Sequence, residues 1–269
     1  MMKIKLLFIS LLVLTTVFLN AAEKKDEPRL MAYKGINVAA KLNNENDTFG
    51  QFKINAGFMY EMVNNTNIFF SYCISALWDG QENSSPFKDI NHNPEFFWVT
   101  SLDFIPFLKG IKPEVKVGYE HISNGVDDES SDYEGLTNRS RSVHNINIHP
   151  AVYFGEDIIF KLSPKFWINT VDRENTDIGD YYGNADLRMS LEIYEEVTFS
   201  VNLRGNPTTG KGRIESQVTL PMSWPATWIF GSKPNTYWFF EYFEGYGETL
   251  LHYNFYNRSF RIGLALARS

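Results

Sequence analysis

Three observations in the sequence predict an all-β chain, a 12-stranded antiparallel transmembrane β-barrel of the outer membrane. Aromatic residues make up 16% of the 269 residues, as in barrels with aromatic girdles at both membrane interfaces. After an apolar N-terminal segment, no stretch approaches the roughly 18 consecutive apolar residues that a membrane-spanning helix needs. Segments that alternate apolar and polar residues recur through the rest of the chain. A soluble exported β-domain is the alternative.

The N-terminal segment has the plan of a secretory signal peptide. Residues 1–22 carry Lys3 and Lys5, then an apolar run, and end in the small residues Ala21 and Ala22. A membrane-anchor helix is the competing interpretation, but the charged residues that follow favour cleavage. We therefore predict a cleaved signal peptide over 1–22, a periplasmic segment over 23–30 and a barrel domain over 31–269.

Period-2 alternation between turn-forming clusters predicts the strands of this domain. The predicted strands cover 31–42, 51–62, 66–78, 94–106, 112–123, 141–154, 158–170, 185–194, 197–204, 213–221, 235–243 and 253–267. Helical periodicity is weak throughout. Twelve strands is an even number, as bacterial outer-membrane barrels have.

The connections alternate between long and short. NNENDT, DGQENSSPFKDINHN, GVDDESSDYEGLTNR and VDRENTDIGDYYGN are long and polar, whereas VNNT, FLKG and GED are short. Outer-membrane barrels have long outer loops and short periplasmic turns, so both termini should lie in the periplasm. The end of the strand at 112–123 should then lie at the outer rim.

The net charge and the cysteine count bear on nucleic-acid binding and on disulfide formation. A net charge of −7 argues against a nucleic-acid partner. Cys73 is the single cysteine, so the exported chain has no intramolecular disulfide.

The stretch YEHISNG at 119–125 places a histidine and a serine two residues apart. On a strand, residues two apart share one face and lie roughly 7 Å apart along the backbone. His121 and Ser123 share the apolar face of Val117, whereas Glu120 lies on the opposite face. Because the apolar face of a barrel meets lipid, both side chains should point outward, where an enzyme that acts on lipids would need them.

A serine nucleophile needs a base and a third group that orients the base. The next strand begins SRSVHNINIHPAVYF, and its apolar face of Ile146 and Ile148 includes His144 and excludes Asn145. Asn145 is the more obvious candidate by residue type, and a bulge at the rim would reverse the choice. Both residues are therefore candidates for the third position.

Four ordered segments resemble the bacterial outer-membrane phospholipase A family. YEHISNG resembles the family's His-x-Ser-Asn-Gly motif and SRSVHN its Ser-Arg-Ser-Trp-Asn-Arg motif. ENSSPFKDINHNPEFF resembles its Ser-Ser-Pro-Phe-Arg-Glu segment, and EGYGETLLHYNFYNRSFRIGLAL its near-terminal Gly-Tyr-Gly-Glu-Ser-Leu segment. The similarity runs from about residue 30 to the end of the chain.

This resemblance implies a 12-stranded barrel and a phospholipase A1/A2, a carboxylic ester hydrolase. Family members hydrolyse the sn-1 and sn-2 acyl esters of phospholipids and lysophospholipids with calcium as cofactor. The active form is a homodimer in the outer-membrane bilayer, with calcium and the acyl chain at the subunit interface. A catalytically impaired member that serves as a channel or scaffold is the alternative function.

The motifs also imply roles for individual residues. Ser123 would be the nucleophile and His121 its general base, and the Gly125 N–H would stabilise the oxyanion. Gap-free matching of SRSVHN places His144, and not Asn145, at the family's asparagine position, so the resemblance implies a Ser-His-His arrangement.

Calcium would be bound by oxygen atoms, which suit a hard cation. The resemblance implies Ser84 of the partner subunit, the Val126 carbonyl and Ser140 as ligands. The loop after Ser123 is longer than usual for the family, so Ser131 competes with Ser140.

Overall fold

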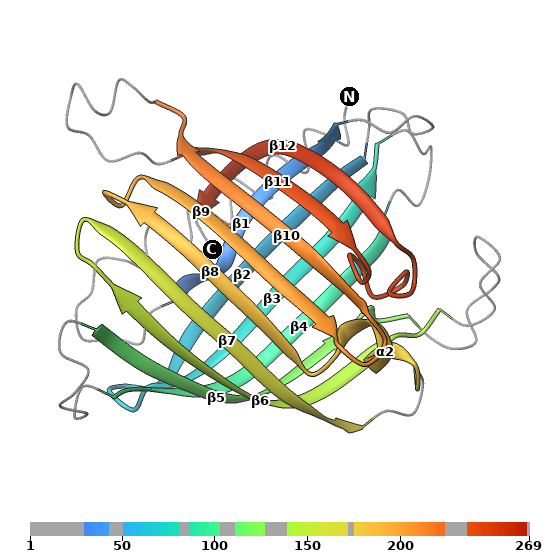
Figure 1. Ribbon diagram of the computed structural model, residues 1–269, viewed down its shortest axis with the longest axis horizontal. Helices are drawn as coiled ribbons and strands as arrows, with labels where there is room; N and C mark the ends of the chain where they lie inside the picture. Colours follow the sequence, from blue (N-terminus) through green and yellow to red (C-terminus); the bar gives the residue numbers. More distant parts are fainter. Residues whose placement is uncertain are drawn as a thin grey trace.

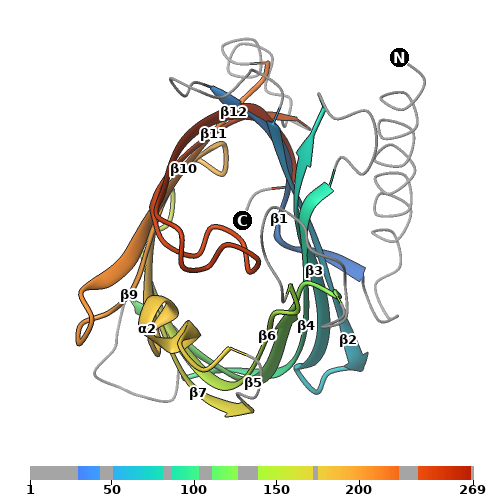
Figure 2. The ribbon, with the colours of Figure 1, turned by 90° about the vertical axis from the view of Figure 1, so that its right-hand side faces the viewer.

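The computed structural model describes residues 30–42, 51–80, 87–102, 111–126, 139–171, 175–223 and 236–267. Within these ranges the chain forms a closed antiparallel barrel in which consecutive strands pair and β12 returns to β1 (Figures 1 and 2). The strands are β1 (Leu30–Leu42), β2 (Gln51–Val63), β3 (Ile68–Asp79), β4 (Phe87–Ser101), β5 (Ile111–Ser123), β6 (Ser142–Phe154), β7 (Ile158–Val171), β8 (Ala185–Ile193), β9 (Val197–Asn206), β10 (Lys211–Pro221), β11 (Tyr237–Gly245) and β12 (Asn257–Ala267). The predicted 12-stranded antiparallel barrel is confirmed.

Alternation along each strand separates a lipid-facing side from the lumen. On β5, Val117 and Tyr119 are 40% and 42% exposed, whereas Lys116 and Glu120 are almost completely buried. The exposed apolar side chains continue across the neighbouring strands, namely Phe96 and Trp98 on β4, Ile146 and Ile148 on β6, and Phe166 and Ile168 on β7. Such an apolar outer band is what a transmembrane barrel presents to lipid.

The predicted strand positions differ from the structure mainly at two places. Strand β4 begins at Phe87 and not at 94, because the polar residues of 87–93 alternate between lumen and outer face and do not form a loop. Strand β12 begins at Asn257 and not at 253.

A short helix, α2 (Ile178–Tyr182), lies in a connection that the sequence predicts only as polar loop. None of the helices in the described ranges has the length and apolar character to cross a bilayer.

The lumen is polar and contains a cavity of about 570 Å³. Ion pairs join nearby strands on its inner wall, among them Lys116–Glu95 at 2.7 Å, Lys165–Glu120 at 2.5 Å and Arg261–Glu241 at 3.2 Å. A buried charge without a partner is costly, so each of these pairs holds two strands in register.

Replacing Arg261 by methionine is expected to destabilise the barrel more than the same change at Arg258. The buried Arg261 guanidinium contacts Glu241 and Glu248, and its loss leaves both carboxylates less compensated, at a cost of about 3–5 kcal/mol. Arg258 pairs with Glu244 at the exposed surface, where solvent screens the charges, and Arg258→Met should cost much less. Guanidinium titrations of tryptophan fluorescence in lipid vesicles measure both, and equal losses would contradict the expectation.

Helix α2 and the segment 246–256 fold over the outer mouth of the barrel (Figure 2). The segment's Leu250 and Leu251 are fully buried and donate their backbone N–H groups to side chains of β4. These side chains are Asn91 and Asp89, each at 3.0 Å. The segment is therefore anchored to the strand that precedes β5.

An apolar cluster joins this cover to the strands below it. It consists of Val143, Ile178, Leu250 and Tyr253, with Ile122, Tyr181 and Tyr182 packed against them. Ile122 lies between His121 and Ser123, and Val143 precedes His144. The cluster thus fixes the inner side of the strand ends whose outer side carries the predicted catalytic residues.

Glu248 ties the same segment to the barrel wall. Burial raises the pKa of its carboxyl, but the charges of Arg261 and Lys53 and its hydrogen bonds outweigh burial and hold the pKa below its usual range. Because the folded pKa is lowered, the stability from Glu248 is present above the ordinary carboxyl pKa. That stability is lost as the pH falls through the folded pKa.

Candidate active site

The outer ends of β5 and β6 bring a serine and two histidines together on the outer face. His121 pairs with His144 across the two strands, and Ser123 pairs with Ser142. The two imidazole rings lie 4.2 Å apart between centroids, with an angle of 34° between their planes. Directly opposed residues share one face of a sheet, so all four side chains point to the lipid side.

The contacts of the two imidazoles differ. His144 Nδ1 lies 2.6 Å from Tyr119 Oη, within hydrogen-bond distance. His121 Nδ1 is buried and has no hydrogen-bond partner among the described residues. In the described part of the chain no hydrogen bond joins His121 to Ser123 Oγ, and catalytic hydrogen bonds are often formed only when substrate is bound.

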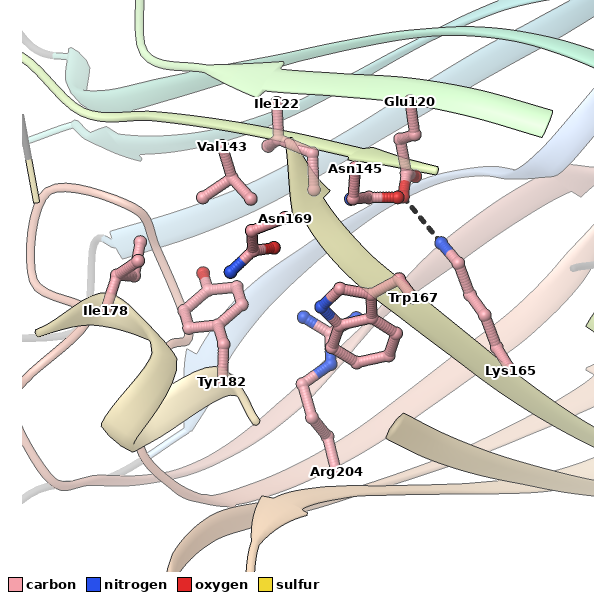
Figure 3. A pocket seen from close by; sticks show the side chains of 10 residues that line it. All are labelled: Glu120, Ile122, Val143, Asn145, Lys165, Trp167, Asn169, Ile178, Tyr182 and Arg204. Carbon is pink, nitrogen blue, oxygen red and sulfur yellow. Dashed lines mark hydrogen bonds and ion pairs between the residues drawn. The ribbon is translucent and has the colours of Figure 1, made fainter. Parts of the chain in front are cut away.

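Asn145 points into the lumen and away from His121. It is buried and donates a hydrogen bond from Nδ2 to Glu120 Oε2 at 3.3 Å, while Asn147 donates to its Oδ1. Figure 3 shows Asn145 beside the Glu120–Lys165 ion pair, among the side chains that line a small inner cavity.

The local irregularity at this position does not alter that orientation. The β6–β7 pairing shifts between His144 and Asn145, because Asn169 and Val171 of β7 oppose these two residues and leave Thr170 extra. The additional residue therefore lies on β7, and β6 keeps its alternation. The β5–β6 register runs unbroken past the same position.

The Ser-Asn-Gly turn is held by Asn124. Its buried side chain donates to the Arg139 carbonyl at 2.7 Å and accepts from the Arg141 N–H at 3.0 Å. Gly125 has a φ of +65°, a left-handed conformation that favours glycine. Among the described residues no hydrogen-bond acceptor is recorded for the Gly125 N–H.

The predicted calcium residues are only partly described. Val126 donates its N–H to Asn124 Oδ1 at 3.4 Å, which keeps it beside the segment that contains Ser140. Asn124 therefore brings these two candidates onto neighbouring stretches of backbone. Ser84 and Ser131 lie outside the described residues, as does the predicted signal peptide.

One neighbour of Ser123 escaped the sequence analysis. His92 on β4 pairs directly with Ser123 from the side opposite to β6. His92 was predicted to lie in a loop, because the predicted strand begins at 94. Alternation from Phe87, with Asp89 and Asn91 on the inner face, would have placed His92 on the outer face beside Ser123.

Comparison with known proteins identifies the family. The family model described as phospholipase A1 matches residues 10–266. The chain belongs to the phospholipase A1 family. It is 27% identical over 198 residues to the phospholipase A1 of Escherichia coli K12 and 26% identical to that of Klebsiella pneumoniae, and each match covers 73% of this chain.

The curated relatives are longer than the matched segment. The match spans 61% of the E. coli relative and 48% of a relative from Neisseria meningitidis. Two solved structures share the fold of this phospholipase A1 family member. Outer membrane phospholipase A from E. coli has a TM-score of 0.70 at 23% identity, and the match covers 89% of this chain and 98% of that one.

The second structure is an outer membrane phospholipase dimer with bound calcium from Salmonella typhi. It has a TM-score of 0.68 at 22% identity, and the match covers 92% of this chain and 94% of that one. The closed barrel, its apolar outer band and the family together place this chain in the outer membrane, as the sequence predicted.

Proposed function

We propose that this family member is a calcium-dependent serine phospholipase A1/A2 of the outer membrane. Its substrates are the sn-1 and sn-2 acyl esters of phospholipids and lysophospholipids. One observation carries the proposal: Ser123, His121 and His144 share the lipid-facing side of β5 and β6, next to the N–H of Gly125. A serine, a base, an orienting group and an oxyanion donor are the parts that acyl transfer needs.

Acylation begins when Ser123 Oγ bonds to the ester carbonyl carbon and passes its proton to His121. The carbonyl oxygen gains negative charge and binds the Gly125 N–H. The ester C–O bond then breaks, and His121 returns the proton to the leaving lysophospholipid alcohol. Water repeats these steps on the acyl-enzyme and releases the fatty acid with Ser123 regenerated.

His144 takes the orienting role in this mechanism. A neutral imidazole can donate from one ring nitrogen and accept at the other. In the tautomer in which His144 Nδ1–H donates to Tyr119 Oη, the Nε2 lone pair can accept from His121 Nδ1–H, which has no partner among the described residues. Tyr119 then holds His144 in the form that can orient His121.

The available donor atoms fit calcium. The proposed ligands are the Val126 carbonyl, the hydroxyl of Ser140 or Ser131, and Ser84 of the partner subunit, all of them oxygens. When bound, calcium would supply positive charge near the developing oxyanion. Because Ser84 would come from a second copy, the active form is a homodimer, like the calcium-bound relative from S. typhi.

The alternative function is a non-catalytic channel or scaffold. The polar lumen cavity of about 570 Å³ is the observation that favours it. The cover formed by α2 and the segment 246–256 over the outer mouth favours the enzyme, because it narrows the route through the lumen.

Removing calcium is expected to lower fatty-acid release by about 10²-fold or more. Purified protein in mixed micelles of detergent and phosphatidylcholine would be assayed with excess calcium, with EDTA, and with calcium restored. Magnesium in place of calcium should restore little activity, because it demands stricter octahedral geometry. Folded wild-type protein that releases no fatty acid with calcium would overturn the enzyme in favour of the channel or scaffold.

A further inference from the structure

His92 occupies the remaining flank of Ser123. On β4, Asp89 and Asn91 face the lumen, where both accept hydrogen bonds from the segment 246–256. His92 follows with the opposite orientation and pairs with Ser123 of β5. Directly paired residues have β-carbons about 4.5–5.5 Å apart, closer than residues two apart on one strand. The β-carbon of His92 is therefore at least as near to the β-carbon of Ser123 as the β-carbon of His121 is.

Tyr72 of β3 holds the imidazole in place. Its Oη lies 2.6 Å from His92 Nδ1. If the phenol O–H donates to the Nδ1 lone pair, the ring proton is on Nε2, since a neutral imidazole carries one proton. In that tautomer the far nitrogen of His92 is a hydrogen-bond donor.

That far nitrogen faces the Ser-Asn-Gly turn. A β-carbon built on Gly125 would lie 3.5 Å from His92 Cδ2 and 3.6 Å from His92 Nε2. The edge of the ring that carries Nε2–H is therefore the edge beside Gly125. His92, the partner of Ser123 on β4, thus has its Nε2 edge beside the glycine that is the proposed oxyanion donor.

From this geometry we infer that His92 is a second oxyanion donor, a role that rests on the phospholipase function proposed above. When Ser123 Oγ bonds to the ester carbon, the carbonyl oxygen accepts hydrogen bonds from Gly125 N–H and His92 Nε2–H. His92 acts as a hydrogen-bond donor and transfers no proton. One lost oxyanion donor typically lowers kcat by about 10²–10³-fold.

The test uses three replacements of His92 that differ in where they place a donor. His92→Gln puts an amide N–H close to the position of Nε2, His92→Asn puts one close to Nδ1, and His92→Phe has none. We expect kcat for phosphatidylcholine hydrolysis to fall about 10²-fold or more in His92→Asn and His92→Phe. His92→Gln should stay within about tenfold of wild type, with KM little changed in all three.

Three further measurements separate a chemical role from a structural one. Tyr72→Phe keeps an aromatic ring but removes the hydroxyl, and it should lower kcat by about tenfold. The variants that lose most kcat should also react most slowly with a long-chain fluorophosphonate at Ser123. The phosphoryl oxygen of this reagent would accept hydrogen bonds from the same two donors, Gly125 N–H and His92 Nε2–H. Thermal unfolding of each variant in detergent is expected to change little.

The outcomes distinguish this inference from the proposed function. An active wild type with kcat unchanged in all three His92 variants would overturn the inference alone. His92→Gln as impaired as His92→Phe would also overturn it, because a donor near Nε2 would then not be what matters. An inactive wild type that the fluorophosphonate does not label would overturn the proposed function and the inference together.

Discussion

Replacing Ser123 by alanine is expected to abolish fatty-acid release, with a loss of at least about 10⁴-fold in kcat. Without Oγ no acyl-enzyme forms, and the Gly125 amide has no tetrahedral intermediate to stabilise. The loss would be measured as calcium-dependent release of fatty acid from phosphatidylcholine. A fluorophosphonate should label the wild type and leave Ser123→Ala unlabelled.

The paired strand provides a matched control for this experiment. Ser142 lies directly opposite Ser123 and is two residues from His144, so β6 carries its own serine and histidine on the outer face. Gly125 lies two residues after Ser123, however, whereas the residue two after Ser142 is His144 and not a glycine. Ser142→Ala should therefore keep kcat within about threefold of wild type. Loss of activity in Ser142→Ala with retention in Ser123→Ala would show that the nucleophile is Ser142 on β6.

The second large effect is expected at His144. His144→Ala should lower kcat by roughly 10²–10⁴-fold, because His121 would lose the group that fixes its tautomer and orientation. Asn145→Ala should leave kcat nearly unchanged and cost about 1 kcal/mol of stability, since Asn145 hydrogen-bonds to Glu120 inside the lumen. Steady-state kinetics and guanidinium unfolding on the same preparations measure both effects.

A third variant connects this position to the family. His144→Asn introduces the residue that the resemblance places there, and its amide oxygen can accept a hydrogen bond from His121. We expect it to keep kcat within about tenfold of wild type. Equal activity in His144→Ala and Asn145→Ala would mean that neither residue orients the base.

The fold was predictable because strand alternation is a local property of the sequence. The aromatic content, the alternating segments and the long and short connections lead to twelve strands without any long-range information. The start of β4 was not predictable in this way, because all of its inner residues between Phe87 and Pro94 are polar. Two of them, Asp89 and Asn91, bind the segment 246–256, a contact between positions more than 150 residues apart.

The same limit applies to the candidate site. Alternation along β6 was enough to predict that His144 faces outward and Asn145 inward, and the structure places them so. The neighbour on the other side of Ser123 depends on the β4–β5 register, which brings His92 to it from 31 positions earlier in the chain. Helix α2 was likewise missed, because Ile178 packs against Leu250 and not against its own sequence neighbours.

The alternation on β5 also limits how this enzyme family can vary in length. The barrel wall is one residue thick, so inserting or deleting a single residue within β5 would exchange its two sides. Glu120 would then face lipid without Lys165, and Ser123 would face the lumen, away from its substrate. Changes in loop length leave this arrangement intact, so insertions and deletions should accumulate in the connections and be excluded from the strand.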